Sequence, residues 1–433
     1  MTHTLKDLKS GKLIGSKELK LACDLKEFPI EILSLADTLE VLDLSDNQLS
    51  ELPDSIVQLR NLKIIFFARN NFTSFPSILS KLPVLNMIGF KSNQIETVPD
   101  DSFPPNLNWL ILTDNKINKL PQSIGHCLQL QKCALAGNLL EELPAEMANC
   151  VNLELIRVSA NKLKVIPNWL FELPKLSWVA FGGNPVTYKI PIDTTIDLFH
   201  WNDFAVQDLL GEGASGFISK ANWISKSKDV AIKIFKGAVT SDGLPDDEMG
   251  IAIAAGFHEN LIQVLGKIKN HPEEKIGLIM KLIEPSYFNL GNPPSLESCT
   301  RDVFDENISF NGAELLKITK GIVSVCAQLH HKGINHGDLY AHNILVNKTA
   351  ECLLGDFGAA TFYDINSNVA SLIERVEVRA FGCLIEDIFG LVNENEICHE
   401  LRTKWEKLII SCFVSEVKKR PGFSEILIEL DTF

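Results

Sequence analysis

Several features that define other protein classes are missing from this 433-residue chain. It has no run of about 18 apolar residues, so the sequence predicts no membrane-spanning helix. Its first residues, Met1-Thr2-His3-Thr4-Leu5-Lys6, lack the apolar segment of a secretory signal peptide. It also lacks an excess of basic residues, and its net charge of −14 argues against nucleic acid or an anionic membrane as its main partner.

The chain contains cysteines, but their spacing matches no known cysteine motif. The ten cysteines are scattered, with no Cys-x-x-Cys pair and no spacing typical of a zinc site. This usage predicts reduced thiols in a cytoplasmic compartment. A protein exported by a specialised secretion system would have the same composition, so that alternative stays open.

The first half of the chain is a repeat array. Seven asparagines recur in steps of 22 or 23 residues, at Asn47, Asn70, Asn93, Asn115, Asn138, Asn161 and Asn184. A proline lies six residues after each of the first six, at Pro53, Pro76, Pro99, Pro121, Pro144 and Pro167. Such a fixed period predicts stacked units that bury a shared core, because one unit alone cannot bury its leucines.

The apolar pattern before each asparagine, such as Leu39-x-x-Leu42-x-Leu44-x-x-Asn47, resembles the leucine-rich repeat. The resemblance covers roughly residues 15–190 and implies an α/β solenoid, in which each unit adds one short strand to a parallel sheet. The recurring asparagine is expected to satisfy backbone groups where each strand turns outward. We therefore predict a repeat domain over residues 1–195.

The strand positions that point away from the solenoid core are unusually apolar. This pattern predicts a concave docking face for a protein or peptide, although neighbouring side chains could half-cover some of these positions. The predicted contact residues are Val41, Ile64, Phe66, Met87, Trp109, Ile111, Leu155 and Trp178.

Four motifs follow in order in the second half of the chain. They are Gly211-Glu212-Gly213-Ala214-Ser215-Gly216, Val230-Ala231-Ile232-Lys233, the stretch from His336 to Asn343, and Asp356-Phe357-Gly358. Each is weak alone, but their order is very unusual by chance. Together they resemble the eukaryotic-type protein kinase domain over residues 200–433. The resemblance implies an α+β two-lobed fold, and no Gly/Ser linker separates it from the repeats.

The resemblance also implies a nucleotide site for ATP. The glycines Gly211, Gly213 and Gly216 would let the backbone close over the phosphates. Lys233 would bind phosphate oxygens, with Glu248 as its counter-charge. The adenine pocket would be formed by Leu210, Ile218, Ala231, Met280 and Leu345.

Catalysis is implied by the two later motifs. Asp338 would orient the attacking hydroxyl group and accept its proton. Asn343 and Asp356 would hold Mg²⁺, which neutralises charge on the transferred phosphoryl group.

Some residues depart from the family pattern. Gly337 replaces the arginine that usually precedes the catalytic aspartate, which predicts a non-RD kinase whose activity does not depend on phosphorylation of its activation segment. Tyr340 replaces a lysine typical of serine/threonine kinases. The segment after Asp356 is short, so Arg420 is expected to lack its customary carboxylate partner, with Glu374 as a possible substitute.

The sequence thus predicts a protein kinase that phosphorylates Ser/Thr hydroxyls of a protein recruited by the repeats. Two alternatives stay open. His336-Gly337-Asp338 also resembles small-molecule phosphotransferases of the aminoglycoside and choline kinase type. A pseudokinase scaffold that acts by protein binding is the other. It is disfavoured because Lys233, Asp338, Asn343 and Asp356 are all present, which a scaffold does not need.

Overall fold

The computed structural model describes residues 3–187, 196–213, 215–236, 240, 242–393 and 397–433. Contacts divide the chain into two compact units. The first comprises Met1–Leu173 with Asn184–Val186, and the second comprises Pro174–Gly183 with Thr187–Phe433. The predicted domain boundary between residues 195 and 200 adjoins residues 188–195, which lie outside the described residues, so it stays a prediction.

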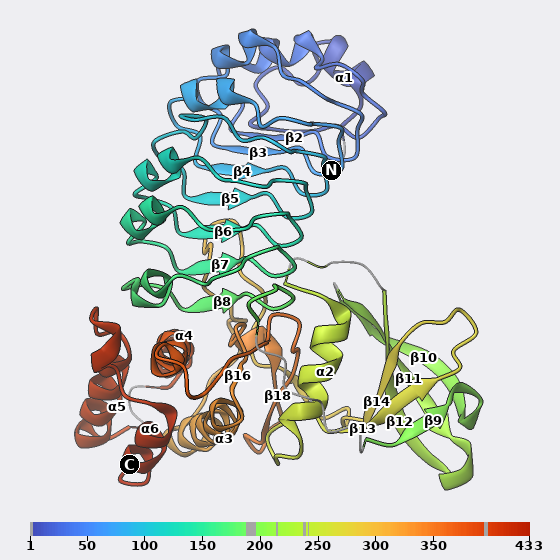
Figure 1. Cartoon of the computed structure of the whole chain (residues 1–433), viewed down its shortest axis with the longest axis vertical. Coiled ribbons are helices and arrows are strands. Elements are labelled where there is room, and N and C mark those ends of the chain that lie inside the picture. The colour runs from blue at the N-terminus through green and yellow to red at the C-terminus, as the bar shows by residue number, and fades with distance from the viewer. Residues whose placement is uncertain (1–2, 188–195, 214, 237–239, 241, 394–396) are drawn as a thin grey trace. The chain divides into compact units, whose positions relative to one another are not determined.

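The first unit is a parallel sheet of very short strands that stack in sequence order (Figure 1). A short helix, α1 (Leu5–Lys9), precedes them. The strands are β1 (Glu18–Lys20), β2 (Val41–Asp43), β3 (Ile64–Phe66), β4 (Met87–Gly89), β5 (Trp109–Ile111), β6 (Lys132–Ala134) and β7 (Leu155–Arg157). Each pairs in parallel with the next, so equivalent positions of successive repeats lie side by side.

The core of this unit lies on one side of the sheet. The central residue of each strand, such as Leu42, Ile65 or Leu110, is completely buried. On the opposite side of most repeats a 3-10 helix begins directly after the recurring proline, whose fixed φ suits an N-terminal position. These helices are η1 (Ile30–Leu35), η2 (Asp54–Gln58), η3 (Ser77–Lys81), η4 (Gln122–His126), η5 (Ala145–Asn149) and η6 (Asn168–Glu172).

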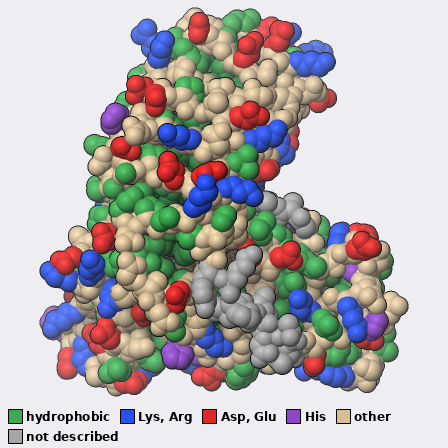
Figure 2. All heavy atoms as spheres, in the orientation of Figure 1, with side chains coloured by type: hydrophobic (Ala, Val, Ile, Leu, Met, Phe, Trp, Pro, Cys, Tyr) green, Lys and Arg blue, Asp and Glu red, His purple; other side chains and the backbone are tan. Residues whose placement is uncertain are grey.

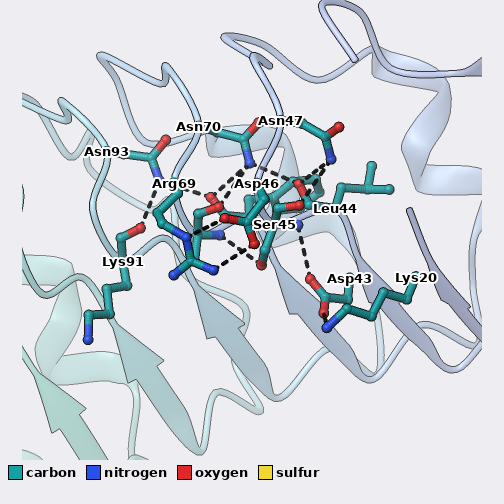
Figure 3. A network of polar contacts seen from close by, with 12 residues as sticks. Lys20, Asp43, Leu44, Ser45, Asp46, Asn47, Arg69, Asn70, Lys91 and Asn93 are labelled. Atoms are coloured by element: carbon teal, nitrogen blue, oxygen red, sulfur yellow. Dashed lines mark hydrogen bonds and ion pairs between the residues drawn. The ribbon is translucent and has the colours of Figure 1, made fainter. Parts of the chain in front are cut away.

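The recurring asparagines form a ladder of hydrogen bonds that links neighbouring repeats (Figure 3). Asn70 is typical: its Nδ2 donates to Leu44 O at 2.9 Å, and its Oδ1 accepts from Leu49 N at 2.9 Å. All seven ladder asparagines are buried. The expected role of these residues in satisfying backbone groups is confirmed. Salt bridges such as that of Lys20 with Asp43, 2.9 Å between Nζ and Oδ2, join the outer ends of adjacent strands.

The second unit contains a six-stranded sheet in the order β10-β11-β12-β14-β13-β9. Its pairs are antiparallel except for β9, which joins β13 in parallel. The strands are β9 (Leu198–His200), β10 (Phe204–Glu212), β11 (Gly216–Trp223), β12 (Lys228–Phe235), β13 (Val264–Lys269) and β14 (Gly277–Lys281). One core of this sheet is built from Phe204, Ala221, Trp223, Val230, Ile232, Ile268 and Ile279.

Helix α2 (Pro245–Ala255) follows β12 in the chain, and the remaining helices belong to the C-terminal part of the unit. Helix α3 begins with a capping box in which Asn311 and Glu314 bond each other's backbone amides. These helices are α3 (Gly312–His331), α4 (Ala370–Gly390), α5 (His399–Cys412) and α6 (Phe423–Leu430). Small sheets are formed by β15 (Phe288–Asn289), β17 (Ile344–Val346) and β18 (Cys352–Leu354), and by β16 (Ile334–Asn335) with β19 (Thr361–Phe362).

The second unit also includes a segment that the repeat period alone would assign to the array. Strand β8 (Trp178–Ala180) lies within Pro174–Gly183, whose contacts place it in this unit. The predicted combination of an α/β repeat solenoid with an α+β kinase-like domain is confirmed, with β8 assigned to the latter by its contacts.

On the face of each unit that Figure 2 shows, acidic and basic side chains lie interspersed. Among the described residues, no helix is both long and apolar enough to span a bilayer.

Candidate active site

An apolar cavity of about 640 Å³ opens between the six-stranded sheet and the C-terminal part of the second unit. Side chains from β10, β11, β12 and β14 form one wall, and residues of β17 and the segment after β18 form the other. The five predicted adenine-pocket residues all line it: Leu210, Ile218, Ala231, Met280 and Leu345. Residues that lie as far apart as 135 positions in the sequence are therefore brought to one site.

An ion pair lies at the wall of the same cavity. Lys233 on β12 and Glu248 on α2 make a direct contact between Nζ and Oε1, and their side chains are only 12% and 5% exposed. Burial raises the pKa of Glu248, against the opposing effect of Lys233, and the Asp356 carboxylate adds to the rise. A buried lysine that is paired in this way is held in one position, where it can contact an anionic group of a ligand.

The loop between β16 and β17 carries the predicted base. Asn343 donates from Nδ2 to both Asp338 Oδ2, at 2.8 Å, and Asp338 O, at 2.9 Å. These two bonds fix the Asp338 carboxylate relative to Asn343. Neither residue lines the apolar cavity itself, but Asn343 O accepts from the amide of Gly355, which does line it, at 3.0 Å.

Two buried residues, His336 and Glu377, hold this loop in place through hydrogen bonds to backbone groups. His336 Nε2 donates to Gly355 O at 2.9 Å, and His336 Nδ1 accepts from the amide of Asp338 at 3.3 Å, so its partners assign the neutral tautomer with the proton on Nε2. Glu377 on α4 accepts from the amides of Gly337, at 2.6 Å, and His336, at 3.2 Å.

Glu377 is completely surrounded by protein and stays a strong hydrogen-bond acceptor. Burial by itself would raise its pKa, but its hydrogen bond with His330, at 2.8 Å, and the amides of the loop lower the pKa below its ordinary value. An ionised carboxylate at this point binds the loop more strongly than a neutral acid would.

The residues predicted to hold Mg²⁺ offer oxygen ligands only. Asp356 supplies a carboxylate, and the bonds that Asn343 donates leave its Oδ1 oxygen outside that network. Among the described residues, no cluster of three His, Cys, Asp or Glu side chains could hold a metal ion unaided. A pair of oxygen ligands fits Mg²⁺, because this ion keeps several other positions for water and phosphate oxygens.

The glycine turn between β10 and β11 shows two different uses of glycine. A Cβ at Gly216 would lie 2.5 Å from Ile234 O, so the neighbouring strand requires glycine there. A Cβ at Gly211 or Gly213 would meet no atom within 4 Å. The fold therefore does not explain the latter two glycines, and a ligand that lies close to the backbone would.

Asp302 is a site residue that the sequence did not reveal. Its carboxylate accepts from the amide of Ala341 at 2.5 Å and from His342 Nδ1 at 2.7 Å. Burial lowers the pKa of His342, but the bond to Asp302 outweighs it and raises the pKa overall. The adjacent Arg301 bonds Asp387 of α4 and Cys383 O. The segment before α3 thus ties the loop to α4.

One prediction about a neighbouring residue, the use of Glu374 as the substitute partner of Arg420, is wrong. Arg420 does not use Glu374, whose Oε1 instead accepts from Phe423 N at 2.8 Å. The guanidinium group donates to the carbonyl oxygens of Val414, Arg375 and Pro174. Burial, followed by the charge of Arg379, lowers the pKa of Arg420 to about 10.

The predicted docking face is not confirmed, and half of its residues are buried. Trp178, 1% exposed, belongs to the second unit and stacks on Tyr340, so it cannot contact a partner on an open surface. Also buried are Met87, Trp109 and Leu155. Half-buried positions remain at Val41, Ile64, Phe66 and Ile111.

Several cavity residues were also missed, among them Ile262, Val264 and Leu278. The only signal of these residues is their apolar character, which predicts burial but does not identify the contacting residues. The pocket was located through its motifs, and these residues carry none.

Comparison with known proteins agrees with this geometry. The protein kinase domain model matches residues 204–382, and the leucine-rich repeat model matches residues 37–95. The first match contains every residue of the cavity and of the loop described above.

Curated relatives are similar to part of the chain. A probable serine/threonine-protein kinase of Dictyostelium discoideum is 26% identical over 189 residues, which cover 43% of this chain and 11% of that protein. An L-type lectin-domain containing receptor kinase of Oryza sativa subsp. japonica is 29% identical over 196 residues, 44% of this chain and 26% of that protein. This chain therefore spans only a small part of the length of these relatives. A solved LRR protein of Leptospira interrogans is 29% identical, with a TM-score of 0.35, over 39% of this chain and 44% of that one.

Proposed function

Since the chain combines a protein kinase domain with leucine-rich repeats, we propose that it transfers the γ-phosphoryl group of ATP to serine or threonine hydroxyls of a protein. The observation that carries this proposal is the cavity itself. It combines an apolar wall that suits a nucleobase with the Lys233–Glu248 pair and Asp356. The serine/threonine preference rests on the similarity to a probable serine/threonine-protein kinase.

Each predicted site residue has a role that fits its position. Lys233, held by Glu248, binds phosphate oxygens, and Gly211 and Gly213 let the turn approach them closely. Asn343 and Asp356 would hold Mg²⁺, which would neutralise charge on the phosphates. Asp338, fixed by Asn343, orients the acceptor hydroxyl group and takes its proton.

The repeats are proposed to recruit the protein substrate. Val41 and Ile64 lie opposite each other in register, and Phe66 and Ile111 occupy the equivalent outer positions of their strands. These half-buried apolar side chains form the part of the predicted docking face that stays open in the first unit. The buried residues Trp109 and Trp178 are left out of the proposed docking surface.

The test is a transfer assay with radiolabelled Mg-ATP, in which wild type is compared with Asp338→Ala. Loss of the base is expected to lower turnover by about 10²–10⁴-fold, because general-base catalysis contributes that much. The control is Asp431→Ala, since Asp431 is a carboxylate with 71% exposure at the end of α6. Its turnover is expected to equal that of wild type.

The destination of the label separates the candidate functions. Label on serine or threonine of protein supports the proposal. Label on a small molecule instead indicates a small-molecule phosphotransferase. If wild type labels neither a protein nor a small molecule, the chain acts as a binding scaffold.

A further inference from the structure

Strand β8 makes an intimate contact with the loop that carries Asp338. The Trp178 ring stacks on Tyr340 with ring centroids 4.4 Å apart and an interplanar angle of 4°. Trp178 Nε1 donates to Leu339 O at 3.1 Å. Leu339 and Tyr340 directly follow Asp338, so one side chain fixes both a ring and a peptide group next to the predicted base.

The contact continues on both sides of Trp178. Asn335 of β16 donates from Nδ2 to Val179 O at 3.0 Å, and the amide of Phe181 donates to Thr361 Oγ1 of β19 at 3.3 Å. Arg420 donates from Nη2 to Pro174 O at 2.6 Å. The segment Pro174–Gly183 thus bonds β16, which directly precedes the catalytic loop, and β19, which pairs with β16. It also accepts a hydrogen bond from the Arg420 guanidinium group.

The same segment explains the absent arginine. Gly337 has φ +72°, and a Cβ there would lie 2.6 Å from Val179 O and 2.8 Å from Ala359 O. Both neighbours are backbone atoms, which cannot move aside as a flexible side chain can. A residue with a Cβ at position 337 would therefore clash with strand β8 in its observed position.

The opposite side of the loop is held by Asp302. The rings of Tyr340 and His342 stack with centroids 5.0 Å apart, and His342 bonds Asp302. Trp178, Tyr340 and His342 form a continuous stack that runs from β8 to Asp302. Asp338 and Asn343 lie at the two ends of the loop that this stack immobilises.

We propose that Pro174–Gly183 does the work of a long activation segment, and that Trp178 is a positioning residue that holds Asp338 through Leu339 and Tyr340. This inference deepens the proposed kinase function and rests on it. The segment is always covalently present, so the loop is ordered without a phosphorylated residue. It follows that turnover depends on a side chain in the last repeat, while nucleotide binding does not.

The test compares full-length Trp178→Ala and Trp178→Phe with wild type in the transfer assay. Because small displacements of a reacting group are costly, Trp178→Ala is expected to lower kcat by about 100-fold while KM for ATP stays unchanged. Trp178→Phe keeps a ring that can stack but loses the N–H donor. Its kcat is therefore expected to lie between that of wild type and that of Trp178→Ala.

A matched control removes another buried tryptophan from the same unit. Trp405 on α5 is completely buried, and its Nε1 has no hydrogen-bond partner among the residues that the structure describes. Trp405→Ala is expected to lower the melting temperature but to leave the kcat of the folded protein unchanged. A loss of kcat that appears in both variants would show a general structural effect and overturn the positioning role.

Amide hydrogen exchange gives a readout that does not need activity. Trp178→Ala is expected to speed exchange at residues 338–343, and Trp405→Ala is not. If exchange there is unchanged in Trp178→Ala, or if its kcat equals that of an active wild type, the inference is wrong. If wild type transfers no phosphate, the proposed function fails, and the exchange result alone decides whether Trp178 orders the loop.

Discussion

At the scale of single residues, the site depends on a few positions where one atom decides what fits. Gly337 is the clearest case, since its backbone is left-handed and two carbonyl oxygens, of Val179 and Ala359, occupy the space of a Cβ. Asp302 is another, because its two oxygens bond a backbone amide and an imidazole of the same loop.

Gly337→Ala is expected to destabilise the protein markedly. The left-handed backbone costs about 1–2 kcal/mol for a residue with a Cβ, and the close contact with Val179 O adds about 1–3 kcal/mol. Urea unfolding would measure the loss. Gly390→Ala is the control, because a Cβ there meets nothing within 4 Å and the backbone is not left-handed. Equal midpoints for the two variants would contradict the steric argument.

At the scale of single elements, the sequence predicted most of the first unit. A period of 22 or 23 residues placed the strands, and the position of each asparagine within that period identified the ladder. The kinase motifs likewise located the cavity wall formed by Ile218, Ala231 and Met280. Local patterns of this kind are readable because the same physical requirement recurs at a fixed spacing.

What the sequence could not predict depends on contacts between distant segments. Trp178 was placed correctly on a strand, yet its partner Leu339 lies 161 residues further along the chain. The repeat pattern shows which way a side chain points but not what covers it. The contact of Asp302 with the catalytic loop could not be predicted for the same reason. Asp302 lies in a segment without periodicity, 39 residues before its partner Ala341.

The ladder can be tested at one repeat. Asn115 accepts from Ile95 N at 3.0 Å and donates to Phe90 O at 2.9 Å and Leu112 O at 3.0 Å. Asn115→Ala removes the partner of the Ile95 amide, whereas Phe90 O and Leu112 O keep the bonds donated by Asn93 and Asn138. The unpaired buried amide is expected to cost about 1–3 kcal/mol of unfolding free energy.

The exposed Asn106 offers a control for this prediction, since it makes one hydrogen bond, to Pro83 O, at the surface. Asn106→Ala is expected to change the unfolding free energy by less than about 0.5 kcal/mol. Chemical denaturation of both variants measures the difference, and similar losses would argue against the ladder as a source of stability.

At the scale of the whole molecule, the division into units does not follow the division into sequence families. The kinase model begins at residue 204, whereas the second unit includes Pro174–Gly183. The limits of a family model describe what relatives share, and contacts describe what this chain needs in order to fold.

A chain that begins at residue 196 is therefore expected to be less stable than one that begins at Pro174. It lacks Trp178, which stacks on Tyr340, and one partner of Arg420. Loss of a buried tryptophan alone costs about 3–5 kcal/mol. Thermal unfolding of the two fragments measures the difference. Identical midpoints would show that the second unit does not rely on Pro174–Gly183.

Strand β8 also has a consequence for how such a chain can change over evolutionary time. Duplication or loss of an internal repeat, for example residues 70–92, alters the array by one period and leaves the sequence from Pro174 onward intact. The same event at the final repeat would delete Trp178. The number of repeats before the last one can thus change, whereas the final strand must be inherited together with the kinase domain. Recombination breakpoints are therefore expected upstream of Pro174.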